Sequence, residues 1–110
     1  IEQAVTGQID AFRRDDGEAA FGYASPAIRL LFGTTTNFMA MVRNGYQPVY
    51  RPRSVRFGAL AEEGGRIVQR VDVVGPDGRP AIALYTMQHE ADGSWKIDGC
   101  EIVHAPPPTS

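Results

Sequence analysis

The chain has 110 residues, which is enough for one folded domain and too few for two. Hydrophobic residues make up 43% and charged residues 22%, a composition typical of a globular domain and not of a disordered chain. The net charge of -2 argues against general binding to nucleic acid or to an anionic membrane, so we expect neither as a partner. No apolar stretch approaches the roughly 18 residues that a membrane-spanning helix needs, so we expect a soluble protein.

The single cysteine, Cys100, excludes an internal disulfide, and no spacing of His, Cys or carboxylate residues is typical of a metal site. We therefore expect no metal and no cofactor. The sequence begins at Ile1 and not at Met, which leaves an export signal removed from the N-terminus as an open alternative. The sequence assigns no cell compartment.

The first half of the chain is predicted to be helical. Ile1, Val5, Ile9 and Phe12 form one apolar stripe at helical spacing. Three shorter helices are predicted to follow, with N-caps at Asp16, Ser25 and the threonine run 34–36, and Gly33 closing the second of them. An extended linker is expected at 46–53, because Pro48 and Pro52 disfavour both helix and strand pairing.

The second half is predicted to form four strands. Turn signals at 63–65, 75–78 and 91–93 separate runs of alternating apolar and polar residues, and short turns join neighbouring strands into an antiparallel meander. In the last run the apolar parity changes after Ile97, so a β-bulge is expected at Gly99. The fold class is therefore α+β, with the N-terminal helices packed in the concave face of a curved four-stranded antiparallel sheet. Residues 1–104 form this single domain, and 105–110 are expected to be an extended Pro-rich tail.

The order of helices, then a meander ending in "DGSWKIDGCEI", resembles the nuclear transport factor 2-like superfamily, also called SnoaL-like or cystatin-like. The stretches "ASPAIRLLFG" and "GYQPVYRPRSVRFG" look like one bacterial family of unknown function within that fold. The resemblance implies a cone-shaped sheet around the helices, shortened here because a full early hairpin is missing. Members include isomerases, dehydratases, cyclases and non-catalytic binding or dimerisation domains, so the resemblance transfers no catalytic residue.

The concave face is the best candidate for a binding site, because an apolar lining with a few uncharged polar groups is typical of a small-molecule pocket. The same make-up is typical of a plain core. The alternation of the strands assigns to this face Phe57, Gln69, Val71, Leu84, Thr86, Gln88 and Trp95. Arg51 and Arg53, beside Tyr50, form a basic cluster that could bind an anion or simply be solvated.

The sequence as a whole favours a non-catalytic domain that is a homodimer and binds a small apolar ligand. The alternative is an isomerase, dehydratase or cyclase with Asp98 or His89 as its base, and a third class is an adaptor that binds a partner protein through 46–53. The residues of opposite parity lie on the outer face of the predicted sheet, and they are too apolar to be left in water. They predict a dimer interface made by Val68, Ala83, Tyr85 and Met87.

Overall fold

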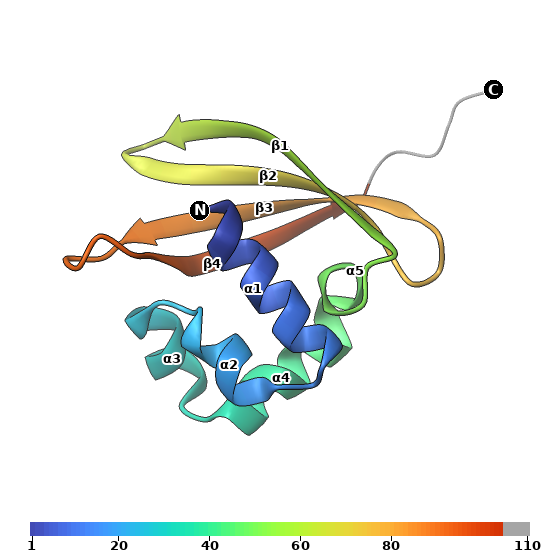
Figure 1. The fold of residues 1–110 in the computed structure, drawn as a ribbon, viewed down its shortest axis with the longest axis horizontal. Coiled ribbons are helices and arrows are strands. Elements are labelled where there is room, and N and C mark those ends of the chain that lie inside the picture. Colours follow the sequence, from blue (N-terminus) through green and yellow to red (C-terminus); the bar gives the residue numbers. More distant parts are fainter. Residues whose placement is uncertain (105–110) are drawn as a thin grey trace.

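The structure is a computed structural model that describes residues 1–104 and, of His104, the backbone alone. The tail predicted at 105–110 lies outside the described residues. Within the described part the helices come first and the strands second (Figure 1). The helices are α1 (Glu2–Arg13), α2 (Gly17–Gly22), α3 (Pro26–Phe32), α4 (Thr35–Gly45) and α5 (Gln47–Tyr50). No helix in this part of the chain is long and apolar enough to cross a membrane.

The predicted helix caps are confirmed. The side chains of Asp16, Ser25 and Thr34 accept hydrogen bonds from backbone N–H groups in the first turns of α2, α3 and α4. Gly33 ends α3 with a φ of 76°, a conformation that glycine adopts at little cost. The expectation of a wholly extended linker is wrong, because α5 places Pro48 in a first helical turn, where a missing N–H breaks no helical bond.

The four strands form one antiparallel sheet in the order β1-β2-β3-β4, which confirms the predicted α+β class. Their bounds are β1 (Ser54–Glu63), β2 (Arg66–Val74), β3 (Pro80–His89) and β4 (Trp95–His104). The helices cover one face of the sheet, and α1 runs beneath it (Figure 1). The other face is left without a covering element among the described residues.

The bulge predicted near Gly99 is confirmed. Thr86 pairs with Gly99 and Met87 pairs with Ile97, so Asp98 is the extra residue on β4. A second irregularity, which the sequence did not predict, interrupts β1 between Phe57 and Leu60. These two bulges bend the strands and increase the local twist of the sheet.

The phase predicted for β3 is wrong. Paired residues share a face, and Val71 pairs with Ala83 while Arg70 pairs with Leu84. Because Val71 is fully buried against the helices, the residues of β3 that face the helices are Ala81, Ala83, Tyr85 and Met87. Leu84, Thr86 and Gln88 therefore lie on the outer face, and Ala83, Tyr85 and Met87 are unavailable for an interface there.

The buried residues form two clusters. One joins α1 to the sheet and includes Val5 and Ile9 of the helix and Val71 and Val73 of β2. The other lies among the helices and is built on aromatic residues: Phe12, Phe38 and Tyr50. In it Phe12 lies 6.1 Å from Phe38 and 6.0 Å from Tyr50, ring centre to ring centre. The two clusters do not pack fully against each other, and a cavity lies between them.

Candidate functional site

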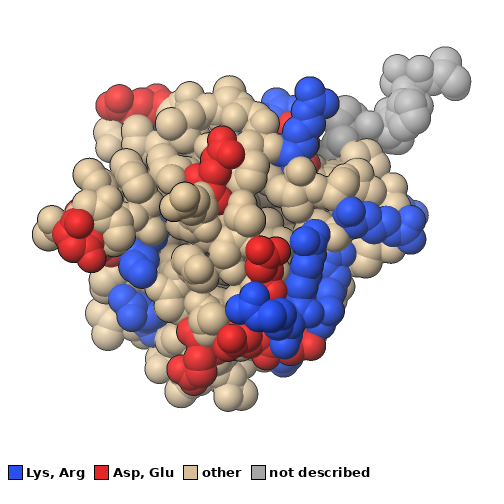
Figure 2. Space-filling model, viewed as in Figure 1, with Lys and Arg blue, Asp and Glu red and all other residues tan. Residues whose placement is uncertain are grey.

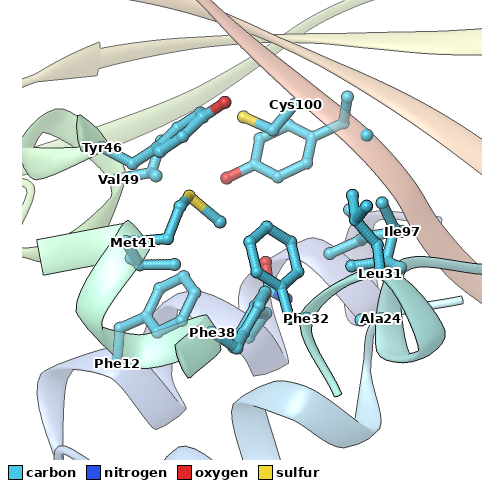
Figure 3. A pocket seen from close by; sticks show the side chains of 15 residues that line it. Phe12, Ala24, Leu31, Phe32, Phe38, Met41, Tyr46, Val49, Ile97 and Cys100 are labelled. Carbon is cyan, nitrogen blue, oxygen red and sulfur yellow. The ribbon is translucent and has the colours of Figure 1, made fainter. Parts of the chain in front are cut away.

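A cavity of about 320 Å³ lies between α3, α4 and the sheet, at the junction of the two buried clusters. It is roughly twice the size of the engineered apolar cavities, about 150 Å³, that bind benzene. Its walls come from both clusters, with Phe12 and Phe38 from the helices and Ile97 from β4. Figure 3 shows these side chains around a common space, with Met41 and Tyr46 facing Leu31 and Phe32 across it.

Most of the lining is apolar. The helical contribution includes Phe12, Ile28, Leu31, Phe32, Phe38 and Met41. Phe12 belongs to the apolar stripe that predicts the first helix, and the others lie at helical spacing on α3 and α4. A stripe at helical spacing predicts burial, but it does not indicate whether the buried face meets another side chain or an open space. For this reason the sequence did not single them out as site residues.

The sheet contributes the polar wall of the cavity. Tyr85 and Cys100 are cross-strand partners on β3 and β4, and both line the cavity. The Tyr85 side chain is 1% exposed, and its hydroxyl lies beside the Cys100 thiol but makes no hydrogen bond of normal geometry in the described part of the chain. Tyr46 adds a second hydroxyl, which points toward the sulfur of Cys100 (Figure 3). Gln8 adds an amide whose nitrogen donates to the carbonyl of Ala20 at 3.1 Å.

Burial keeps this wall uncharged. It raises the pKa of the Tyr85 hydroxyl well above its usual value, and the neighbouring Cys100 adds to the effect. It also raises the pKa of the Cys100 thiol to about 12, although the Tyr85 hydroxyl beside it acts in the opposite direction. At neutral pH both groups are protonated, so the wall offers hydrogen-bonding groups and no nucleophilic thiolate.

The rim of the cavity lies on α3, where two adjacent leucines are exposed. Leu31 is 73% exposed and lines the cavity, whereas Leu30 is 84% exposed and does not. None of the residues of α3 is buried, so this helix packs loosely on the rest of the domain. The pair provides one leucine at the opening and one neighbour of the same type away from it.

The seven residues predicted to line the pocket lie elsewhere. Gln69 and Val71 are buried in the sheet core, and Phe57 packs against it. The amide nitrogen of Gln69 donates to the carbonyl of Gly58 at 3.0 Å and so holds the irregularity in β1. Leu84 and Thr86 lie on the outer face because the β3 phase was assigned wrongly. The cavity lies on the helix-covered side of the sheet, but helices and β4 supply most of its lining.

A second depression, next to the cavity along β4, contains Gln88 and Trp95, together with both residues considered as a base. Asp98 accepts a hydrogen bond from the Ser25 hydroxyl at 2.6 Å and pairs with Arg66 at 2.7 Å. His89 stacks on Trp95, with 4.4 Å between ring centres. The carboxylate of Asp98 therefore ties the start of α3 to the bulge of β4.

Arg51 and Arg53 do not converge on a common point. Arg51 pairs with Asp15 at 2.6 Å and lies over the ring of Tyr50, and Arg53 donates to the carbonyl of Pro76 at 3.1 Å. Each guanidinium is thus engaged by a different part of the chain. Among residues 1–104, no group of three or more His, Cys, Asp or Glu side chains is arranged to hold a metal ion.

The family model described as "Domain of unknown function (DUF4864)" matches residues 1–110. The chain belongs to this family. Comparison with curated proteins and with solved structures gave no match. The cavity between the helices and β4 is therefore the candidate functional site of a DUF4864 domain, defined by its geometry alone.

Proposed function

We propose that this chain is a non-catalytic binding domain that takes up one small, mostly apolar molecule between its helices and its sheet. The observation that carries the proposal is the cavity of about 320 Å³, apolar on most sides, with a buried hydroxyl that lacks a partner in the described residues. Ligand pockets combine these two features, an apolar body and a few placed polar groups. A plain core would instead be filled to normal packing density.

The enzymatic alternative gains no specific support from the cavity. No Asp, Glu or His is among the residues that line it, and Asp98 and His89 line a separate depression. Asp98 is engaged by Arg66 of β2 and by Ser25, and the Ser25 contact holds the start of α3 in place. The cavity therefore favours a binding function.

The binding proposal is tested with N-phenyl-1-naphthylamine, a neutral dye whose fluorescence rises in apolar surroundings. We expect the wild-type protein to enhance the emission and to saturate. Leu31→Glu places a charge at the rim of the cavity and should weaken binding several-fold, because the bound dye would lose an apolar contact and would partly desolvate the carboxylate. Leu30→Glu is the matched control and should bind as the wild type does. Equal weakening by both variants, or no binding by the wild type, would contradict the proposal.

We further propose that the domain belongs to the nuclear transport factor 2-like superfamily. The order of elements supports this, because helices precede a four-stranded antiparallel meander and pack in its concave face. A cavity between that sheet and the helices fits the same architecture. Fold-level analogy of this kind suggests no particular reaction.

We also propose that two copies pair through the outer face of the sheet, with a set of residues different from the one first predicted. Leu84 is partly exposed at the middle of this face, with Arg70 beside it on β2 and Glu101 beside it on β4. A two-fold axis along β3 would place Leu84 against its counterpart, and Arg70 of one copy against Glu101 of the other. This charge complementarity favours a second copy as the covering partner.

A further inference from the structure

The Tyr85 hydroxyl is a buried polar group whose partner is missing from the described chain. It comes from the middle of β3, is 1% exposed, and lies at the wall of the cavity. A buried polar group without a partner costs about 1–3 kcal/mol of folding free energy. Buried hydroxyls in native proteins usually have a partner, so this one requires an explanation.

Water alone does not fill this site. A water at the Tyr85 hydroxyl would have Tyr46 and Cys100 as polar neighbours, but it would leave the rest of the cavity, which is mostly apolar, unfilled. The amide nitrogen of Gln8 already donates to the carbonyl of Ala20. A ligand with an acceptor oxygen would satisfy the hydroxyl of Tyr85 while its apolar body fills the space beside Phe12 and Phe38.

The charge of the wall restricts the ligand further. No Lys or Arg lines the cavity, so a carboxylate or phosphate would be buried without a counter-charge. No Asp or Glu lines it either, which disfavours a cation. Because burial raises the pKa of both Tyr85 and Cys100, neither supplies a negative charge at neutral pH.

We infer that the ligand is a neutral molecule of about bicyclic size that presents a carbonyl oxygen to the Tyr85 hydroxyl. This inference rests on the proposed binding function and adds the chemical class of the ligand. The apolar body lies among the aromatic residues of α1, α3 and α4, and the carbonyl end points to the β3–β4 wall. Tyr85 is thus the residue that distinguishes a ketone or aldehyde from a hydrocarbon of the same shape.

The test uses three probes that share one ring system: 2-acetylnaphthalene, its alkene isostere 2-isopropenylnaphthalene, and the anion 2-naphthoate. Their dissociation constants are measured by displacement of N-phenyl-1-naphthylamine. We expect the wild type to bind the ketone about tenfold more tightly than the alkene, as a net gain near 1.4 kcal/mol from one hydrogen bond predicts. We expect 2-naphthoate to bind more weakly than both.

Two variants show which hydroxyl group at the cavity binds the ketone. Tyr85→Phe should bind ketone and alkene with similar affinity, whereas Tyr46→Phe, which removes the other hydroxyl at the cavity, should keep the preference. Tyr85→Phe removes only an unpaired oxygen, so its thermal unfolding midpoint should equal or exceed that of the wild type. A second measurement needs no variant: the infrared carbonyl stretch of bound 2-acetylnaphthalene should lie at lower frequency than in an apolar solvent.

Other results would overturn the ligand class, the assignment to Tyr85 or the proposed function. Equal binding of ketone and alkene by the wild type, an unshifted carbonyl stretch, or tighter binding of 2-naphthoate would overturn the inference and leave apolar ligand binding standing. Loss of the preference in Tyr46→Phe but not in Tyr85→Phe would overturn the assignment to Tyr85. Failure of the wild type to bind either neutral probe would overturn the proposed function and this inference together.

Discussion

At the scale of single residues, the pairing of Tyr85 with Cys100 decides the chemistry of the cavity wall. Both side chains could ionise in water at moderately alkaline pH, and burial opposes this in both. The wall is therefore a pair of neutral groups, one hydroxyl and one thiol. The raised pKa of Cys100 makes its thiol unreactive at neutral pH.

We predict that Cys100 reacts very slowly with iodoacetamide in the folded protein. At pH 8 a thiol with a pKa of about 12 has roughly two thousandfold less thiolate than one with the ordinary value near 8.5. Labelling is followed by mass spectrometry in buffer and in denaturant, and the denatured chain supplies the control rate. Similar rates in the two conditions would contradict the prediction.

The same pKa shift fixes the sign of a pH effect on stability. A thiol whose pKa is raised by folding stabilises the fold fully below its unfolded pKa, and this contribution is lost as pH rises toward the folded value of about 12. Above pH 9, Cys100→Ala should therefore lose stability less steeply with pH than the wild type does.

At the scale of secondary-structure elements, the strand phase was the least predictable feature. Ile82 and Leu84 are more hydrophobic than Ala81 and Ala83, so alternation alone placed the wrong set toward the helices. The position of the turn between β2 and β3 determines which residues of the two strands pair. Val74 pairs with Pro80, so the turn is centred on Asp77, and odd-numbered residues of β2 must then pair with odd-numbered residues of β3. The helix caps were predictable because each depends on a few adjacent residues.

We predict that Gly7→Ala destabilises the domain by up to about 2 kcal/mol, although alanine favours a helix over glycine by about 1 kcal/mol. Gly7 lies in α1 directly beneath the ring of Tyr23, and an added Cβ would overlap that ring. Overpacking of this kind typically costs about 1–3 kcal/mol. Denaturant unfolding measures the change, and Thr6→Ala, an exposed neighbour on α1, should be neutral or stabilising. A stabilised Gly7→Ala variant would show that Tyr23 moves aside freely.

Asp15 connects the end of α1 to α5. It accepts a hydrogen bond from the Tyr50 hydroxyl and pairs with Arg51, and both contacts lower the pKa of its carboxyl, the hydrogen bond from Tyr50 most. Acidic and basic side chains crowd together at this corner of the molecule (Figure 2). The two contacts fix the start of the path that leads from α5 into β1.

We predict that Asp15→Asn lowers the urea midpoint at pH 7 and that the difference from the wild type shrinks at pH 3. A carboxyl whose pKa is lowered by folding stabilises the fold above its unfolded value, near 3.9, and loses this contribution as pH falls through the folded value. Asp10→Asn, on the exposed side of α1, is the control and should change the midpoint less. The same midpoint difference at both pH values would contradict the prediction.

At the scale of the whole molecule, the α+β class could be predicted and the cavity could not. Periodicity places each apolar stripe on an element, and short turns order the strands. The position of α4 relative to the sheet depends on how the aromatic residues Phe12, Phe38 and Tyr50 pack together. That packing separates α4 from β4 and leaves room in front of Ile97 and Cys100. Long-range packing of this kind leaves no mark in a single sequence.

We predict that the protein is a dimer at micromolar concentration and that Leu84→Glu makes it a monomer. A charge at the middle of the outer face would be buried against its own counterpart, which is strongly unfavourable. Light scattering coupled to gel filtration measures the mass. Leu30→Glu changes the same residue type on α3, far from the sheet face, and should remain dimeric. A monomeric wild type, or a dimeric Leu84→Glu variant, would remove the proposed interface.

The segment between α2 and α3 makes two backbone hydrogen bonds with β4, and these bear on how the domain avoids aggregation. The backbone N–H of Ser25 donates to the carbonyl of Ile97 at 2.8 Å, and the N–H of Ile97 donates to the carbonyl of Tyr23 at 2.8 Å. The link between α2 and α3 thus occupies part of the β4 edge, where another chain could otherwise add a strand. If α3 detaches, the edge and the apolar cavity are uncovered together. A molecule bound in the cavity should therefore also protect the protein against fibril growth.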